Sequence, residues 1–179
     1  MAKNLYCIVG ESGSGKTTIA NELEEMFGLK QIQSYTTRPK RSNDETGHTF
    51  ITPEQFKELK NICAYANYNG YDYCATAEQI ENNCIYVVNP AGIEQLKNNY
   101  KGNKKIYTIY ISCRLADRYN RMKARGNTYD EALKRVINDA DEFNGYKNNC
   151  DFVVRNDNCD DFSNVIDKIA EFINAKENE

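Results

Sequence analysis

The sequence has no long apolar run, no Cys-x-x-Cys pair and only one histidine. A membrane-spanning helix needs about 20 apolar residues in succession, and no run here approaches that length. The first four residues lead straight into a strand-like segment and lack the hydrophobic region of a signal peptide. Together these absences predict a soluble protein of the cytoplasm.

The seven cysteines are scattered along the chain and odd in number. This spacing argues against a zinc site and against a disulfide framework. Most of the cysteines lie in apolar, strand-like runs, where a thiol acts as a small buried side chain. A reducing cytoplasm is the compartment that this usage favours.

The sequence also lacks an excess of positive charge, since 23 basic residues face 26 acidic ones and the net charge is −3. This balance argues against a general nucleic-acid-binding protein. No repeat, low-complexity tract or linker interrupts the 179 residues, a length that fits one domain. We therefore expect a single unit that acts as a monomer or a homodimer, with no nucleic acid or membrane as partner.

A glycine-rich stretch near the N-terminus carries the strongest functional signal. Residues 10–17 read Gly-Glu-Ser-Gly-Ser-Gly-Lys-Thr and follow an apolar run of strand length. Glycines let the backbone approach phosphate oxygens, and successive N–H groups then form an anion cradle at a helix N-terminus. In this pattern Lys16 reaches the β- and γ-phosphates, and the Thr17 hydroxyl binds Mg²⁺. A glycine turn without function is the alternative interpretation.

Apolar runs alternate with amphipathic segments, which predicts an α/β fold with a parallel sheet. The expected strands lie near 4–9, 31–35, 84–88, 106–112 and 151–154. The expected helices lie near 15–27, 90–98, 114–125, 129–145 and 160–174. Apolar residues of the last helix form one stripe behind an N-cap at Asp160 or Asp161.

Residues 34–82 differ from this pattern because they contain short strand-like runs joined by turns. Pro53 fits the first turn of a short helix in this segment. We expect an inserted lobe for the second substrate, and a helical lid at 114–145. The remaining segments, 1–33, 83–113 and 146–179, would form the core.

Clustered cations mark the loop at the start of this lobe. Arg38, Lys40 and Arg41 lie among hydroxyl side chains, and guanidinium groups suit the bidentate capture of a phosphate monoester. A solvated basic loop is the alternative. The one histidine, His48, is expected to be a surface residue of this loop.

A second group of arginines falls on one face of the expected lid helix. Arg114, Arg118, Arg121 and Arg125 are spaced i, i+4, i+7 and i+11, without evident acidic partners. Such a stripe suits a lid that closes over a triphosphate, and Arg135 on the next helix could join it. A solvated basic face is the alternative here.

Taken together, the phosphate loop and the loop Ser34-Tyr35-Thr36-Thr37-Arg38-Pro39-Lys40-Arg41 resemble the guanylate kinase family, and the resemblance runs from about residue 5 to 172. It implies a P-loop kinase fold, ATP with Mg²⁺ as phosphoryl donor, and a nucleoside monophosphate as acceptor. It implies that Ser34, Arg38, Arg41 and Tyr73 hold the acceptor's phosphate. Phe50 stands where the family motif has tyrosine. The motif's glutamate aligns with Asp44, or with Glu45 after a one-residue shift.

The same resemblance extends to the ATP side of the site. The segment Val153-Val154-Arg155-Asn156-Asp157 is similar to a family strand end whose asparagine lies near the ATP base. The residues expected to bind ATP are Gly10, Glu11, Ser12, Gly13, Ser14, Gly15, Lys16, Thr17, Thr18 and Asn156. The residues expected to act in catalysis are Lys16, Arg121, Arg125 and Arg135.

Three departures from the family pattern concern recognition of the base. Ala64 and Ala75 stand where the family has a glutamate and a serine or threonine, and Val87-Val88-Asn89 replaces an acidic D-x-D run. The leading hypothesis is ATP-dependent phosphorylation of GMP or dGMP. Another nucleoside monophosphate, or a sugar phosphate, stays open as acceptor. A phosphopeptide-binding module is a third hypothesis, which the retained Lys16 and Thr17 disfavour.

Overall fold

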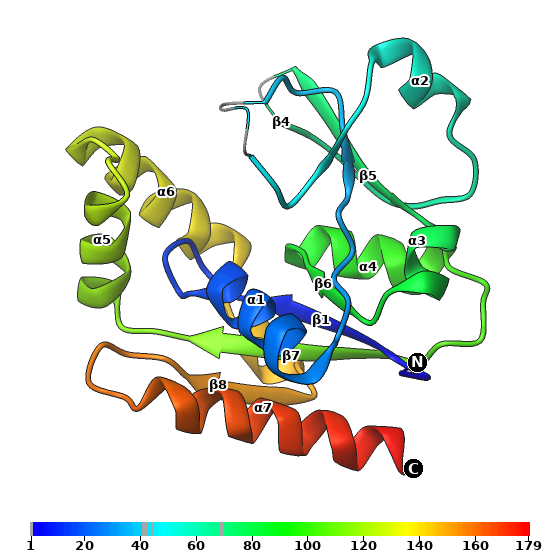
Figure 1. The fold of residues 1–179 in the computed structure, drawn as a ribbon. Coiled ribbons are helices and arrows are strands. Elements are labelled where there is room, and N and C mark those ends of the chain that lie inside the picture. Colours follow the sequence, from blue (N-terminus) through cyan, green and yellow to red (C-terminus); the bar gives the residue numbers. More distant parts are fainter. Residues whose placement is uncertain (1, 41–42, 44, 69) are drawn as a thin grey trace.

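The structure is a computed structural model that describes residues 2–40, 43, 45–68 and 70–179. Its described elements form two four-stranded sheets with helices around them (Figure 1). No helix of the described part of the chain is both long enough and apolar enough to cross a bilayer.

The central sheet has the strand order β6-β1-β7-β8 and is entirely parallel. Its strands are β1 (Leu5–Val9), β6 (Ile85–Val87), β7 (Ile106–Ser112) and β8 (Phe152–Arg155). Every residue of β1 is buried, as expected for a central strand covered on both faces. The α/β fold with a parallel core sheet is therefore confirmed.

One expected strand, at 31–35, is wrong. Gln31 makes only an isolated bridge to Ile85, and the short β2 (Tyr35–Thr36) belongs to the second sheet. Burial of Ile32 explains the strand-like pattern, because this connection runs along the edge of the central sheet beside β6. The segment carries the chain from the phosphate loop's helix into the second sheet.

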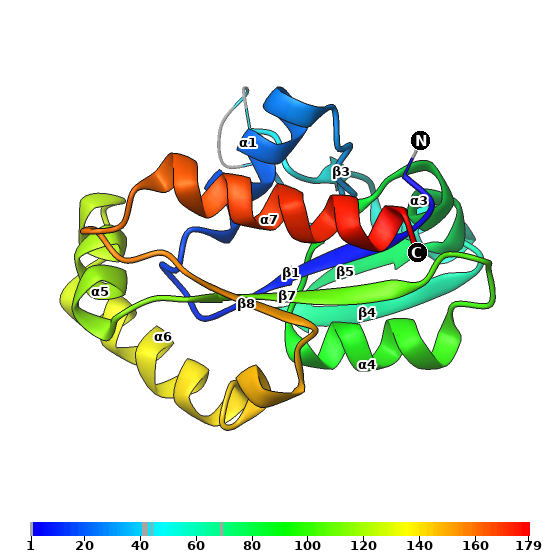
Figure 2. The ribbon, with the colours of Figure 1, turned by 90° about the horizontal axis from the view of Figure 1, so that it is seen from below.

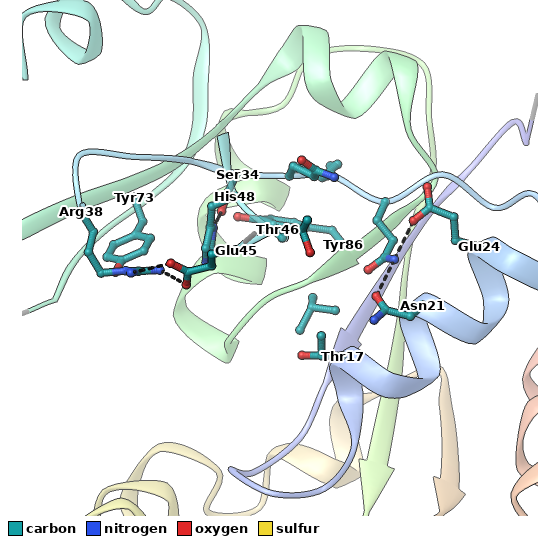
Figure 3. Close-up of a pocket in the computed structure, with 15 residues that line it drawn as sticks. Thr17, Asn21, Glu24, Ser34, Arg38, Glu45, Thr46, His48, Tyr73 and Tyr86 are labelled. Carbon is teal, nitrogen blue, oxygen red and sulfur yellow. Dashed lines mark hydrogen bonds and ion pairs between the residues drawn. The ribbon is translucent and has the colours of Figure 1, made fainter. Parts of the chain in front are cut away.

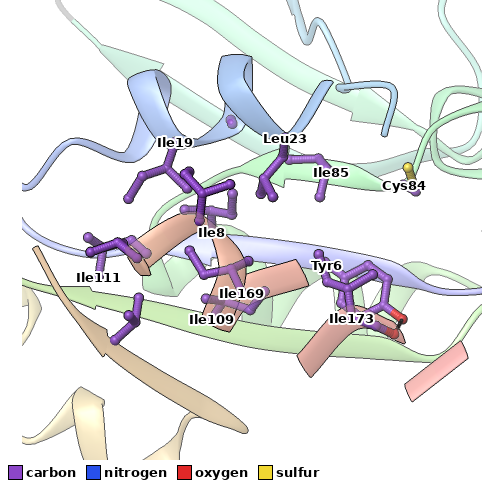
Figure 4. Close-up of a cluster of buried hydrophobic side chains, with 14 residues drawn as sticks. Tyr6, Ile8, Ile19, Leu23, Cys84, Ile85, Ile109, Ile111, Ile169 and Ile173 are labelled. Carbon is purple, nitrogen blue, oxygen red and sulfur yellow. Dashed lines mark hydrogen bonds between the residues drawn. The ribbon is translucent and has the colours of Figure 1, made fainter. Parts of the chain in front are cut away.

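Alternate residues of β1 point to opposite faces of the sheet, and each face has its own core. On one face, Tyr6 and Ile8 pack with α1 (Lys16–Phe27) and α7 (Phe162–Glu177), as Figure 4 shows. On the other face, Leu5, Cys7 and Val9 pack with α4 (Pro90–Asn99) and with residues of the second sheet. Figure 2 shows α7 and α4 on opposite sides of the central strands.

Helix α7 has the N-cap and the buried apolar stripe that its sequence pattern predicts. Asp161 caps its N-terminus by accepting a hydrogen bond from the Ser163 N–H at 3.1 Å. Its apolar stripe is buried against the sheet, with Ile169 fully inaccessible to solvent. The packing of α7 against the sheet thus supports β1, the strand from which the phosphate loop begins.

The second sheet has the order β3-β2-β5-β4 and lies beside the carboxyl end of β6. Its remaining strands are β3 (Thr49–Phe50), β4 (Ile62–Tyr68) and β5 (Tyr71–Thr76). Two short helices, α2 (Pro53–Glu58) and α3 (Ala77–Asn82), each begin with a threonine capping box. The expected turn at Pro53 is confirmed, whereas the sequence did not indicate α3.

Two further helices stand at one end of the central sheet, beside the loop that joins β1 to α1 (Figure 1). They are α5 (Leu115–Ala124) and α6 (Tyr129–Glu142), and a 3₁₀ helix follows at Tyr146–Asn149. A capping box between Thr128 and Glu131 starts α6. The arginine-bearing segment of the sequence is therefore helical and adjoins the phosphate loop.

Candidate active site

The phosphate loop leaves β1 at Val9 and enters α1 at Lys16. Gly13 and Gly15 have φ values of 80° and 99°, which side chains with a Cβ rarely adopt. A methyl group at Gly13 would lie 2.6 Å from the Arg118 carbonyl oxygen. Glycine is therefore required here both for backbone conformation and for close contact with α5.

Lys16 folds back over this loop. Its ammonium donates hydrogen bonds to the carbonyl oxygens of Gly10 at 2.6 Å and Glu11 at 3.0 Å. The pKa of Lys16 is lowered from 10.5 to about 8, mainly by burial and also by the positive charges of Arg118 and Arg125, while Asp139 and Glu11 act in the opposite direction. The protein thus holds the ammonium in a poorly solvated position, where its charged form is less favourable than in water.

This lowered pKa predicts proton uptake on ATP binding. Bound phosphates favour the ammonium, so at about pH 9 each ATP that binds should bring a proton to Lys16. At about pH 7 Lys16 is already protonated and this uptake should vanish. Titration calorimetry in two buffers of different ionisation enthalpy measures the difference. Equal proton uptake at both pH values, or persistence of the uptake in Lys16→Ala, would contradict the prediction.

Asn156, expected near the ATP base, contacts the phosphate loop itself. Its buried amide donates a hydrogen bond to the Ser14 carbonyl oxygen at 2.8 Å, directly beneath Gly15. Arg121 lies nearby, with Nη1 3.3 Å from the same carbonyl oxygen. Thr18 is exposed on the first turn of α1. Asn156 after β8 and Arg121 of α5 thus contact the same carbonyl oxygen of the loop.

The arginine stripe departs from the expectation that it lacks acidic partners. Arg114 pairs with Asp117 at 3.0 Å, and Arg118 pairs with Asp139 at 2.6 Å. The Arg114–Asp117 pair has i,i+3 spacing and could have been found in the sequence, whereas Asp139 comes from a different helix and no spacing indicates it. Arg125 of the stripe and Arg135 on the next helix are exposed.

The acceptor side of the site is a cleft of about 590 Å³ between α1 and the second sheet (Figure 3). Arg38 lines it, with Nε 3.1 Å from the Tyr73 hydroxyl and Nη2 2.7 Å from Glu45 Oε1. Its guanidinium lies 5.4 Å from the centre of the Phe50 ring. The hydrogen bond that Arg38 donates to Glu45 is the largest cause that raises the pKa of Arg38. The structure thus brings Arg38, Phe50 and Tyr73 together.

Two expected acceptor residues, Arg41 and Asp44, lie outside the described residues. Glu45 is the acid that contacts Arg38, which agrees with the shifted alignment of the loop motif. The side chains of Arg38 and Glu45 are only 11% and 17% exposed, so the pair is part of the cleft wall. A phosphate arriving at Arg38 would therefore compete with a resident carboxylate.

His48 is a partly exposed residue of the loop, and it also lines the cleft. Its Nδ1 lies 2.9 Å from the Ser34 hydroxyl, and its ring meets Tyr73 edge to face at 5.5 Å. Both His48 and Ser34 line the cleft (Figure 3). Sequence reasoning missed His48 because a single histidine in a polar loop carries no spacing signal.

This contact predicts a role in acceptor binding. His48→Ala should raise the KM for the acceptor about fivefold, since a hydrogen bond that orients Ser34 contributes about 1 kcal/mol. His48→Asn, which keeps a polar group near the position of Nδ1, should recover much of the loss. Steady-state kinetics at saturating ATP measure both values. An unchanged acceptor KM in His48→Ala would count against a role for this residue.

Thr17 connects the two halves of the site. Its side chain is exposed at the start of α1 and lines the same cleft as Arg38 and Tyr73. Asn89, at the next strand end, is occupied by other contacts, since its Oδ1 accepts from the Gly92 N–H at 3.0 Å and its Nδ2 donates to Glu142 at 2.7 Å. Thr17 therefore presents an exposed hydroxyl to the cleft, whereas both polar atoms of the Asn89 side chain are already hydrogen-bonded.

The two alanines at the base-reading positions lie deep in the second sheet. Ala64 on β4 pairs with Ala75 on β5, and they are 3% and 0% exposed. Both belong to the apolar cluster beneath the cleft. Neither side chain can donate or accept a hydrogen bond, so any polar recognition of a base must come from other groups.

A parallel α/β sheet with a glycine-rich loop between its first strand and the following helix, and a cleft that Thr17 and Arg38 both line, is the arrangement of a P-loop kinase. The guanylate kinase family model matches residues 2–176 of the chain. The guanylate kinase of Thermotoga maritima is 29% identical over 189 residues, covering 98% of this chain and 90% of that protein. That of Hydrogenovibrio crunogenus is 26% identical over 172 residues, covering 89% and 83%. The chain belongs to the guanylate kinase family.

The fold agrees with a solved structure of this family. The guanylate kinase from Anaplasma phagocytophilum superposes with a TM-score of 0.67 at 18% identity, covering 99% of this chain and 88% of that one. Family membership makes the chain a phosphotransferase of the nucleoside monophosphate kinase class.

Proposed function

We propose that the protein transfers the γ-phosphoryl group of ATP to GMP or dGMP. The single observation that carries this proposal is the cleft in which Thr17 of the phosphate-loop helix and Arg38 of the loop after β2 line the same space. Anion-binding groups on two walls of one cleft suit a reaction between two phosphates. The names of the curated relatives support guanine as the acceptor's base.

In this proposal the chain's own groups position and neutralise the two substrates. The amides of residues 10–18 and the Lys16 ammonium hold the donor's phosphates, while Ser34, Arg38 and Tyr73, together with Arg41, hold the acceptor's phosphate. An oxygen of the acceptor phosphate forms a bond to the γ-phosphorus as the bond to the β–γ bridging oxygen breaks. Arg121, Arg125 and Arg135 supply positive charge to the transferring group.

Mg²⁺ is the metal that this assignment requires, and Thr17 is the residue that would bind it. Mg²⁺ is commonly held by one or two protein oxygens, with phosphates and water completing its shell. Bound there, it would neutralise charge on the β- and γ-phosphates. Only the hydroxyl of Thr17 is assigned to it from this chain.

We also propose that the chain works as three parts, with a core, a lobe at 34–82 for the acceptor and a lid at 114–145. The second sheet and the Arg38 cluster support the lobe, and α5 and α6 beside the phosphate loop support the lid. All seven cysteines are free, which supports a reducing cytoplasm as the location.

An assay of ADP formation with Mg·ATP and a panel of ribo- and deoxyribonucleoside monophosphates tests the proposed function. We expect the highest kcat/KM with GMP or dGMP. Because Ala64 and Ala75 offer no hydrogen bonds, we expect the preference over other bases to stay below the roughly 10⁴-fold of sites that bind a base through paired polar groups. Absence of activity with every nucleotide of the panel would refute the proposal.

A further inference from the structure

Asp139 on α6 contacts the phosphate loop directly. Its Oδ2 accepts hydrogen bonds from the Ser12 backbone N–H at 2.8 Å and from the Arg118 guanidinium at 2.6 Å. Its Oδ1 accepts one from the Ser12 hydroxyl at 3.2 Å. The side chain is 9% exposed. A carboxylate from the lid region therefore occupies an amide of the loop assigned to ATP.

The charges around this contact are already balanced. Arg118 reaches the loop's own acid as well, with Nη1 3.3 Å from Glu11 Oε1, and its Nε donates to the Ser12 carbonyl oxygen at 3.0 Å. Lys16 and Arg118 thus face Glu11 and Asp139 at this end of the loop. A further anion would meet two carboxylates, and like charges in a poorly solvated site repel strongly.

The hollow beside Asp139 is where the end of a polyphosphate would lie. Asp139 lines a space of about 250 Å³ together with Gly10, Ser12 and Lys16. In this loop pattern the lysine reaches the β- and γ-phosphates rather than the α-phosphate. The carboxylate of Asp139 would therefore lie beside the terminal phosphates of a bound ATP.

Of the two carboxylates, Asp139 is the one that can move away. Glu11 is part of the loop, whereas Asp139 is on a helix that has few buried residues, namely Ala132 and Asp139 itself. Leu133 and Ile137 of α6 are 42% and 56% exposed. Asp139 connects α6 to the loop through its polar contacts with Ser12.

We propose that Asp139 is a positioning residue that acts as a displaceable anion. It occupies the Ser12 amide until the terminal phosphates of ATP replace it, so that ATP binding and release of α6 from the loop are coupled. The proposal rests on the proposed function in that the loop binds ATP. ATP binds more tightly when Asp139 has left the Ser12 amide. Removing the carboxylate should therefore strengthen ATP binding, because no free energy is then spent on breaking the Asp139–Ser12 contact.

The test is Asp139→Asn, which removes the charge and keeps the size of the side chain. By calorimetric titration we expect the Kd for ATP to fall about tenfold, within the range typical of coupled sites, and the Kd for AMP to stay the same. The midpoint of thermal unfolding without nucleotide should fall, because the attachment of α6 is weakened. Asp141→Asn, which removes an exposed charge from the same helix, should change none of these values.

Unchanged or weakened ATP binding in Asp139→Asn would overturn the proposal, because a residue with a purely structural role would not improve ligand affinity. Failure of the unaltered protein to bind ATP would refute the proposed function itself and is visible in the same titration. A second measurement needs no variant. The ¹³C resonance of the Asp139 carboxyl should move toward that of a solvated carboxylate on saturation with ATP, while that of Asp141 stays in place. An unmoved Asp139 resonance would also overturn the proposal.

Discussion

Replacement of Lys16 by alanine should reduce kcat about a thousandfold or more while the protein stays folded. The ammonium lies on the phosphate loop, 2.6 Å from the Gly10 carbonyl oxygen, where it can follow charge on the transferring phosphoryl group. Loss of one preorganised charge at a phosphoryl-transfer site has effects of about this size. Steady-state kinetics with the preferred nucleoside monophosphate, at saturating Mg·ATP, measure the change.

The same variant should keep or gain stability. Folding lowers the pKa of Lys16 from 10.5 to about 8, so the folded protein bears a cost for the charged form. This cost is complete below about pH 8 and shrinks as the pH rises toward 10.5, where the unfolded chain also loses the proton. Lys168→Ala, a change at an exposed lysine of α7, is the matched control for activity. Near-normal turnover in Lys16→Ala would contradict the assignment of the loop.

Replacement of Arg38 by glutamine should raise the KM for the acceptor about a hundredfold and leave the KM for ATP nearly unchanged. The side chain lines the acceptor cleft, and two charge-assisted hydrogen bonds to a phosphate account for an effect of this size. Lys57→Gln removes an exposed cation from the same part of the chain and should have little effect. Initial rates with each substrate varied in turn separate the two KM values.

Glu45 offers an internal control for this result, because it forms the ion pair with Arg38 at 2.7 Å. In Arg38→Gln the carboxylate loses that partner and would itself repel a phosphate. The double variant Arg38→Gln, Glu45→Gln removes both charges. We expect its acceptor KM to stay far above that of the unaltered protein, since the phosphate still lacks its guanidinium. Full recovery of the KM would show instead that Arg38 serves only to neutralise Glu45.

The fold could be predicted where local patterns and packing agree. The apolar run of β1 and the stripe and cap of α7 each signalled an element that the structure contains. A strand was wrongly predicted at 31–35 because Ile32 is buried at the sheet edge, as a strand residue would be. The segment makes only an isolated bridge to Ile85 there. Helix α3 has a clear capping box, but it is too short for helical periodicity to reveal it.

The site could be predicted only as far as its contacts are local in sequence. The phosphate loop and the Arg38 loop are continuous segments of sequence, so their residue types and spacing were enough to predict phosphate binding. Asp139 contacts Ser12 across 127 residues of sequence, so no spacing rule indicates that pair. His48 contacts Ser34 because β2 and β3 lie side by side, which only the fold determines.

The central claim is that two anion-binding sites face each other across one cleft. A ligand that joins adenosine and guanosine through five phosphates tests it most directly, because it can occupy both sites at once. Calorimetry should show binding about 10²- to 10⁴-fold tighter than that of ATP alone, and Arg38→Gln should remove most of this gain. Binding no tighter than that of ATP, or a gain that survives Arg38→Gln, would contradict the account.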